Sequence, residues 1–305
     1  MIKGWRGGVV LLPLFVLACV SLDVHLDRRA SRWGLEREIV VGAGFDHLAY
    51  RQGGTWVGRE LHVYLEGDGH PWLDETSVSP DPTPRRPLAL ELMRLDPVDS
   101  VYLGRPCYHG LGGERSCTPD LWTGRRYGTA VVDSMEEAIR QLLGQESSVA
   151  LVLVGYSGGG VLAVLLAERL EMIRAVITVA ADLDVDAWAD LHGYSRLEGS
   201  ANPGDRAPLP ASLVQIHLAG GRDANVPVSI VESFAERQPE AELLLFPDFD
   251  HACCWARVWP TVLDTLAVRL AVAQTEAANS VSDDLPADPA PGYALGSSKA
   301  KELNR

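Results

Sequence analysis

Several features that would indicate particular functions are rare in this 305-residue chain or missing from it. The formal net charge is −14, with 27 Lys and Arg against 41 Asp and Glu, so binding to nucleic acid or another polyanion is disfavoured. Cysteine is scarce, at five residues, and no Cys-x-x-Cys or His-x-x-x-His spacing accompanies it, which argues against a metal site. No apolar run approaches the roughly 20 residues that a membrane-spanning helix needs. We therefore expect no metal, no other cofactor and no nucleic-acid partner.

The first 18 residues resemble an export signal. Lys3 and Arg6 precede a short apolar stretch, which is the order found in secretory signal peptides. Cys19 directly follows Ala18, as in the lipobox of bacterial lipoproteins, where the cysteine is lipidated and becomes the first mature residue. An ordinary signal peptide and an uncleaved anchor are the alternatives. The resemblance implies a lipid anchor on Cys19 in the bacterial cell envelope, facing the periplasm, and the absence of Asp at position 20 favours the outer membrane.

Four further cysteines, Cys107, Cys117, Cys253 and Cys254, make an even number in a chain expected to be exported. Disulfide bonds are favoured in such a compartment. A Cys107–Cys117 bond is the first choice because it would close a Gly-rich loop that has little apolar content. A bond between the adjacent Cys253 and Cys254 is geometrically demanding, so cross-pairing with the other two cysteines and a reduced pair are both open.

Short apolar runs alternate with helical patterns from about residue 38 to residue 273. Buried strands are predicted at 39–41, 61–65, 100–103, 149–154, 175–179, 213–218 and 243–246. Helices are predicted between them, at 88–95, 129–143, 159–172, 227–237 and 258–273. This alternation predicts one α/β domain with a mostly parallel sheet and helices on both faces. Residues 19–37 are expected to form an irregular tether, and residues 274–305, which are poor in large apolar side chains, a disordered tail.

A serine lies between a predicted strand and a predicted helix, in Gly155-Tyr156-Ser157-Gly158-Gly159. The glycines permit a sharp turn in which the serine is exposed at the N-terminus of the helix. Such a turn is typical of a nucleophile, and a Gly-rich turn that holds an inert serine is the alternative.

A nucleophilic serine needs a base that takes its proton and a carboxylate that orients the base. In the chain order that accompanies this turn, the acid and then the histidine follow the serine, each in a loop after a later strand. Asp223 follows the predicted strand 213–218, and His251 follows 243–246, so these two residues are the predicted acid and base. The alternatives are less well placed: Asp182, Asp184 and Asp250 as the acid, and His70, His109, His192 and His217 as the base.

An acyl-transfer site also needs donors for a developing oxyanion. The backbone N–H of Gly158, directly after the serine, is the first predicted donor, with support from the following helix. The second is expected in the loop 66–69, from the N–H of Asp68 or alternatively Gly69. Glu66 stands where many hydrolases have His, so its carboxylate must be paired or protonated to avoid opposing the oxyanion. An ordinary turn is the alternative explanation of these glycines.

Together these motifs resemble those of the α/β-hydrolase superfamily. The matching segments are 67–69, 155–159, 220–227 and 250–251, and the resemblance covers about residues 39–273. It implies an eight-stranded sheet with minimal or no cap domain, because only about residues 182–210 are available where a cap is commonly inserted. More narrowly, the segments 65–69, 104–107 and 251–255 resemble a little-characterised group of bacterial lipoprotein-like hydrolases.

The resemblance implies a serine hydrolase, most simply a carboxylesterase that acts on small-molecule esters of short acyl chains. Ser157 would attack the carbonyl carbon, His251 would carry the proton, and Asp223 would hold His251 in the useful tautomer. No cluster of Arg or Lys beside the motifs indicates a phosphorylated or acidic substrate. An acyltransferase or peptidase with the same triad is an alternative, as is a non-catalytic lipoprotein that uses the fold for binding or scaffolding.

Overall fold

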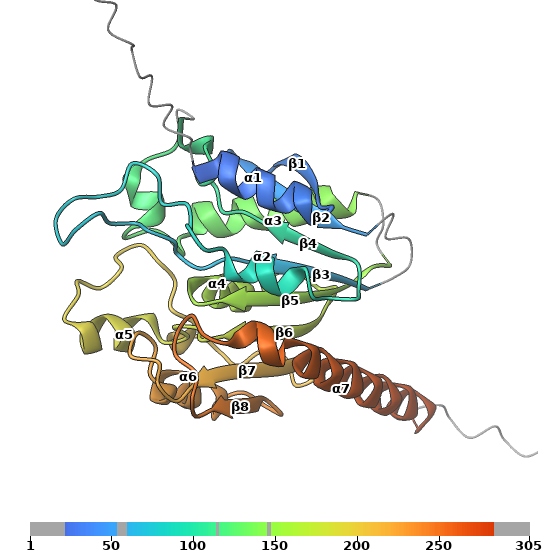
Figure 1. Cartoon of the computed structure of the whole chain (residues 1–305). Helices are drawn as coiled ribbons and strands as arrows, with labels where there is room; N and C mark the ends of the chain where they lie inside the picture. Colours follow the sequence, from blue (N-terminus) through green and yellow to red (C-terminus); the bar gives the residue numbers. More distant parts are fainter. Residues whose placement is uncertain (1–21, 54–59, 114–115, 145–147, 284–305) are drawn as a thin grey trace, which may run out of the picture.

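The computed structural model describes residues 22–53, 60–113, 116–144 and 148–283, and a single eight-stranded sheet lies at its centre (Figure 1). The strand order is β1-β2-β4-β3-β5-β6-β7-β8. The strands are β1 (Glu36–Val41), β2 (Asp46–Gln52), β3 (Glu60–Leu65), β4 (Ser100–Leu103), β5 (Ala150–Tyr156), β6 (Ile173–Val179), β7 (Val214–Gly220) and β8 (Glu242–Phe246).

Most of the sheet is parallel. Strands β4, β3, β5, β6, β7 and β8 run in one direction, and β2 is antiparallel to both of its neighbours, β1 and β4. The carboxyl ends of the parallel strands therefore meet at one edge of the sheet, which is the left edge in Figure 1. Ligands of open α/β sheets bind at this edge, and the loops after β3, β5, β7 and β8 all emerge there.

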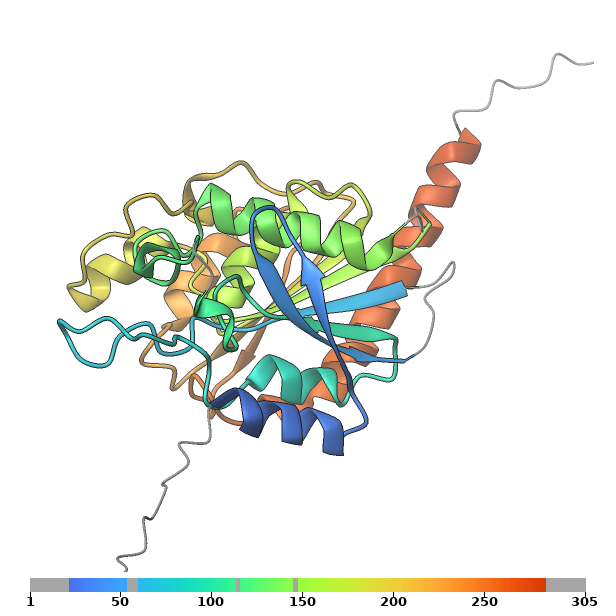
Figure 2. The ribbon, with the colours of Figure 1, turned by 90° about the horizontal axis from the view of Figure 1, so that it is seen from above.

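Helices cover both faces of the sheet, as Figure 2 shows. One face packs against α1 (Leu22–Arg32), α2 (Leu88–Met93) and α7 (Trp255–Asp283), and the other against α3 (Thr129–Leu143), α4 (Gly158–Ala167) and α6 (Val228–Ala235). The short α5 (Val185–His192) lies at the carboxyl edge. Each face thus has its own apolar core, and the predicted mostly parallel α/β architecture of eight strands is confirmed.

Strand β2 is an element that the apolar pattern did not predict. Its residue His47 is buried, with Nδ1 hydrogen-bonded to the Gly104 carbonyl at 2.9 Å and Nε2 to Ser134 Oγ at 2.7 Å. A buried polar side chain is tolerated when its hydrogen bonds are satisfied. Since those partners lie 57 and 87 residues away in the chain, the local sequence gave no sign of them.

The expectation of an irregular tether over 19–37 is wrong for the described part of that segment. Residues 22–32 form α1, and residues 36 and 37 already belong to β1. Leu26 and Ala30, four residues apart, are buried against the α2–α7 side of the sheet. This two-residue apolar stripe was hidden among charged side chains, but it is sufficient to dock one face of a helix.

At the other end of the chain, α7 continues to Asp283, ten residues beyond the predicted domain boundary at 273. The rest of the predicted tail, the predicted signal peptide and Cys19 lie outside the described residues. Within the described ranges, no helix is both long enough and apolar enough to cross a membrane.

Candidate active site

Ser157 occupies a sharp turn between β5 and α4. Its φ of 51° and ψ of −128° place a non-glycine residue in a sparsely populated backbone region. A Cβ atom at Gly155 would lie 2.2 Å from the carbonyl oxygen of Gly159, and one at Gly159 would lie 2.2 Å from that of Leu65. Both flanking positions therefore require glycine, and the turn has the predicted strand–turn–helix form.

The structure brings Ser157, Asp223 and His251 together, although the serine is 94 residues from the histidine in the chain. His251 Nε2 lies 3.1 Å from Ser157 Oγ, and His251 Nδ1 lies 2.8 Å from Asp223 Oδ2. In the tautomer that suits both contacts, Nδ1–H donates to the carboxylate and Nε2 accepts from the hydroxyl. A proton can then pass from the serine to the histidine.

The Asp223 carboxylate is itself held in place. Its side chain is fully buried, and Oδ1 accepts from the backbone N–H groups of Asn225, at 2.9 Å, and Val226, at 2.8 Å. The other oxygen is thereby aimed at His251. The side chain of His251 is 24 % exposed, so the histidine is reachable from solvent.

The alternative acids and bases have other partners. Asp184 caps α5, Asp250 accepts from the N–H groups that follow His251, and Asp182 accepts from the Tyr127 hydroxyl. Three of the histidines considered as alternative bases are hydrogen-bonded to other groups. His109 pairs with Tyr102, His192 with the Asn225 carbonyl and His217 with Thr178.

The loop after β3 packs against the serine turn. A Cβ atom at Gly67 would lie 3.2 Å from Ser157 Cβ, and one at Gly158 would lie 2.1 Å from Asp68 Oδ1. Gly69 instead turns away, because a Cβ there would lie 2.0 Å from the Pro82 carbonyl oxygen. Residues 67 and 68 are therefore the part of the predicted donor loop that lies against the serine turn.

Comparison with known proteins identifies the architecture. No family model matches the chain, and no curated protein matches it. Among solved structures, an esterase of Pyrococcus furiosus has a TM-score of 0.55 at 13% identity, covering 79% of this chain and 91% of its own. A putative hydrolase of Agrobacterium vitis has a TM-score of 0.53 at 16% identity, covering 75% and 98%. A membrane phospholipase A described as a bacterial virulence factor has a TM-score of 0.52 at 14% identity, covering 81% and 91%.

The chain has the α/β-hydrolase fold. At these identities the likeness extends to the architecture and not to the activity. Ser157 follows β5, Asp223 follows β7 and His251 follows β8, which is the order expected of a nucleophile, an acid and a base in this fold. Within the described residues, the segment 182–210, where a cap is commonly inserted, forms only α5, a single 3-10 turn and connecting loops.

Glu66 departs from the usual pattern of the α/β-hydrolase fold. Its side chain is buried, and its two oxygens face the N–H groups of Gly67, at 3.2 Å, and Ala89, at 3.0 Å. Burial raises the pKa of Glu66 to about 8, against the smaller opposing effect of these hydrogen bonds. The residue is therefore protonated at neutral pH, in agreement with the expectation that it is paired or protonated.

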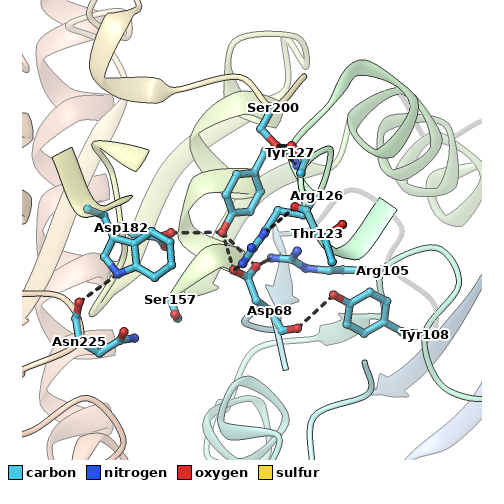
Figure 3. A network of polar contacts seen from close by, with 12 residues as sticks. Asp68, Arg105, Tyr108, Thr123, Arg126, Tyr127, Ser157, Asp182, Ser200 and Asn225 are labelled. Atoms are coloured by element: carbon cyan, nitrogen blue, oxygen red, sulfur yellow. Dashed lines mark hydrogen bonds and ion pairs between the residues drawn. The ribbon is translucent and has the colours of Figure 1, made fainter. Parts of the chain in front are cut away.

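Two arginines meet the carboxylate of Asp68, and the sequence did not predict them as part of the site (Figure 3). Arg105 Nη2 and Arg126 Nη1 each lie 2.7 Å from one of its oxygens, and the Tyr127 hydroxyl donates to the same carboxylate. The expectation that no Arg cluster lies near the motifs is therefore wrong. The two arginines follow different elements and come together only in the folded chain.

Helix α5 contributes a second unpredicted set of contacts. Trp188 Nε1 and His192 Nε2 lie 3.0 and 2.7 Å from the Asn225 carbonyl oxygen, and the Asn225 amide Nδ2 lies 3.1 Å from His251 Nε2. These contacts hold the loop that carries Asp223. They depend on an asparagine two residues after the acid, and the sequence offered no signal that would distinguish it from other loop residues.

The cysteines pair as Cys107 with Cys117 and Cys253 with Cys254. The first pair is the predicted first choice, and the second is the vicinal alternative, so the structure does not show the cross-pairing. Within the described ranges, no group of three or more His, Cys, Asp or Glu side chains could hold a metal ion.

Proposed function

We propose that this protein is a serine hydrolase, and specifically a carboxylesterase that acts on small-molecule acyl esters. The observation that carries the proposal is the pair of contacts from His251, at 3.1 Å to Ser157 and at 2.8 Å to Asp223, with the serine at a turn between strand and helix. A packed core explains neither the unusual backbone of Ser157 nor a partly exposed histidine held between a hydroxyl and a buried carboxylate.

The reaction follows from the geometry. As Ser157 Oγ bonds to the ester carbonyl carbon, its proton moves to His251 Nε2, and Asp223 stabilises the imidazolium that forms. Collapse of the tetrahedral intermediate breaks the bond to the alcohol, which takes the proton from His251. Water then attacks the acyl-enzyme by the same route and releases the acid, which restores the serine.

The carbonyl oxygen becomes negative during each attack and needs donors. The N–H of Gly158 begins α4, whose dipole favours negative charge at that end. The N–H of Asp68 is the second proposed donor, because the loop 67–68 lies against Ser157. Such donors supply a large share of catalysis, since removal of one typically costs about 10²- to 10³-fold in kcat.

The absence of a cap over the described site supports substrates that enter from open solvent, and esters of short acyl chains fit this best. Two of the similar structures are named as an esterase and a phospholipase, which supports acyl-ester chemistry without specifying the alcohol. The chemistry of the triad also suits an acyltransferase or a peptidase, and an assay that varies the acceptor and the bond separates these outcomes.

Hydrolysis of p-nitrophenyl esters with acyl chains of two to eight carbons tests the proposal. We expect kcat/KM to be highest for the short chains, and to fall about 10⁴-fold or more in Ser157→Ala and His251→Ala. Ser233→Ala is the matched control, because Ser233 is exposed on α6 and lies outside the turn that holds Ser157. A folded wild-type protein that hydrolyses no ester, amide or thioester would leave the binding-module alternative.

We also propose that the chain is exported and lipidated on Cys19. The support is the lipobox-like sequence at Leu17-Ala18-Cys19, together with the two disulfides, which persist in oxidising compartments. Mass spectrometry of protein from a bacterial membrane fraction should find Cys19 as an N-terminal, acylated residue. A peptide in which Cys19 is still joined to Ala18 would contradict this.

A further inference from the structure

Asp68 is held at both its side chain and its backbone by residues that the triad does not use. Its carboxylate accepts hydrogen bonds from Arg126 and Tyr127 and forms an ion pair with Arg105, and its carbonyl oxygen accepts from the Tyr108 hydroxyl at 3.0 Å. Figure 3 shows these side chains converging on Asp68, with Ser157 next to it. The side-chain contacts fix the position of Asp68, and the Tyr108 contact fixes the Asp68–Gly69 peptide, so the loop that carries the Asp68 N–H is held from two sides.

The cluster is buried, which makes it expensive to maintain. The side chains of Arg105 and Arg126 are 2% and 7% exposed, and each buried ion costs several kcal/mol of desolvation before its partners compensate. Although burial opposes the charge of Asp68, the two guanidinium groups hold the pKa of its carboxyl below the usual value. The ion pairs therefore remain ionised throughout the working range of an esterase.

The net charge of the cluster depends on pH. Two guanidinium groups face one carboxylate at Asp68, and all three guanidinium nitrogens of Arg105 are buried without a hydrogen-bond partner, so Arg105 meets Asp68 as an ion pair alone. A second acid, Asp182, adjoins the cluster, and its Oδ2 lies 3.2 Å from the Tyr127 hydroxyl oxygen. Burial, and then the charge of Asp68, raise the pKa of Asp182 to about 6. Above that pH the two carboxylates balance the two guanidinium groups, and the cluster has a net positive charge only in acid.

The cluster lies beside the proposed oxyanion donors, which supports a role in catalysis as well as in stability. The carboxylate of Asp68 lies against the Cα of Gly158, whose N–H is the first proposed oxyanion donor. The N–H of Asp68 itself is the second proposed donor. Another buried ion pair, between His62 and Asp96, lies in the first half of β3, away from the loop that follows this strand. That pair touches none of the triad or oxyanion residues, so it provides an internal control.

We propose that Arg105, Arg126 and Tyr108 are positioning residues that hold the loop of Asp68 against Ser157, with the Asp68 N–H directed at the oxyanion. This inference rests on the proposed hydrolase function. It concerns the transition state, and not the ground-state binding of substrate. An interaction that acts only in the transition state lowers kcat when it is removed, and leaves KM nearly unchanged.

The test uses Tyr108→Phe, Arg126→Lys and Arg126→Met in the full chain, with Asp96→Asn as the control. For each we measure kcat and KM on a p-nitrophenyl ester and the inhibition constant of an alkyl boronic acid, which mimics the tetrahedral intermediate. Thermal unfolding of each variant is measured in parallel, and the kinetic assays are run at a temperature where every variant is folded. Tyr108→Phe removes a single hydroxyl group, so it keeps the inference testable even if the arginine variants fail to fold.

We expect kcat to fall about 10- to 100-fold in Arg126→Met, less in Arg126→Lys, and about 3- to 10-fold in Tyr108→Phe, with KM changed less than about threefold. The boronic acid should lose affinity in parallel with kcat/KM. Asp96→Asn should lower the unfolding temperature and leave kcat within about twofold.

Two results would overturn the inference. One is a kcat within about twofold of wild type in folded Tyr108→Phe or Arg126→Met. The other is a rise in KM alone, confined to esters that carry a carboxylate, which would make the arginines a binding site for acidic substrates. Failure of the proposed function is distinguishable, because the wild-type protein would then show no turnover and no inhibition.

Discussion

Replacing Asp223 with Asn tests the orientation of the proposed base with the smallest change of shape. Oδ1 of Asp223 accepts from two backbone N–H groups, while Oδ2 accepts from His251 Nδ1. In Asp223→Asn, only the amide oxygen can face the two N–H groups, so the amide NH₂ must face His251. The ring then accepts at Nδ1 and carries its proton on Nε2, where it can no longer accept from Ser157.

The expected fall in kcat therefore comes from the wrong tautomer of His251 and not only from the lost negative charge. In the serine-protease triad the same exchange costs about 10⁴-fold in kcat, and two backbone donors that enforce one amide orientation favour a comparable loss here. At about 1.4 kcal/mol for each factor of ten, this corresponds to about 5 to 6 kcal/mol of transition-state stabilisation.

The assay is ester hydrolysis at pH 7 to 8, with Asp264→Asn as the control because Asp264 is exposed on α7. Thermal unfolding should show that both variants are folded. If kcat of Asp223→Asn falls less than about tenfold, Asp223 is not the residue that orients His251, and the assignment of the triad is wrong.

Three further predictions follow from buried ionisable groups. Ionisation of Glu66, with its pKa raised by burial to about 8, should reduce kcat above that pH, and Glu66→Gln should abolish this decline in a pH profile from 6 to 10. Since the pKa of Asp182 is raised from 3.8 to about 6, its ionised form destabilises the fold. Asp182→Asn should therefore raise the free energy of unfolding at pH 8 by at most about 3 kcal/mol, a gain that disappears as the pH falls toward 4. Burial lowers the pKa of His47, His109 and His217 from 6.5 to about 4. The free energy of unfolding in urea titrations should therefore decrease as the pH is lowered from 6.5 to 4, by at most about 3 kcal/mol for each residue. Because Asp182 and Glu66 titrate with the opposite sign in this interval, each histidine is assessed by the difference between the wild type and its His→Asn variant, and a difference that is independent of pH would contradict burial of that histidine as a neutral ring.

The parallel strands were predictable because strands buried on both faces are nearly continuous apolar runs, as in 151–154 and 175–179. Strand β2 and helix α1 were not. His47 is buried because of hydrogen bonds to distant residues, and α1 docks through Leu26 and Ala30 in an otherwise charged segment. In both cases the tertiary contacts, and not the local pattern, decide the structure.

The site divides in the same way. Ser157, Asp223 and His251 were predictable because the turn around the serine and the order of the following strands restrict where the partners can lie. Arg105 and Arg126 were not, since they meet Asp68 across 37 and 58 residues of chain and no spacing rule links them. Asn225 likewise connects α5 to His251 only in the folded chain, where Trp188 and His192 of α5 contact its carbonyl oxygen.

The central claim is that Ser157 is the nucleophile, and covalent labelling tests it most directly. The full-length protein is treated with a fluorophosphonate, digested and mapped by mass spectrometry, alongside Ser157→Ala and Ser233→Ala. We expect one adduct per chain, on the peptide that contains Gly155-Tyr156-Ser157, in the wild type and in Ser233→Ala, and none in Ser157→Ala. An adduct on a different residue, or labelling that survives Ser157→Ala, would contradict the account.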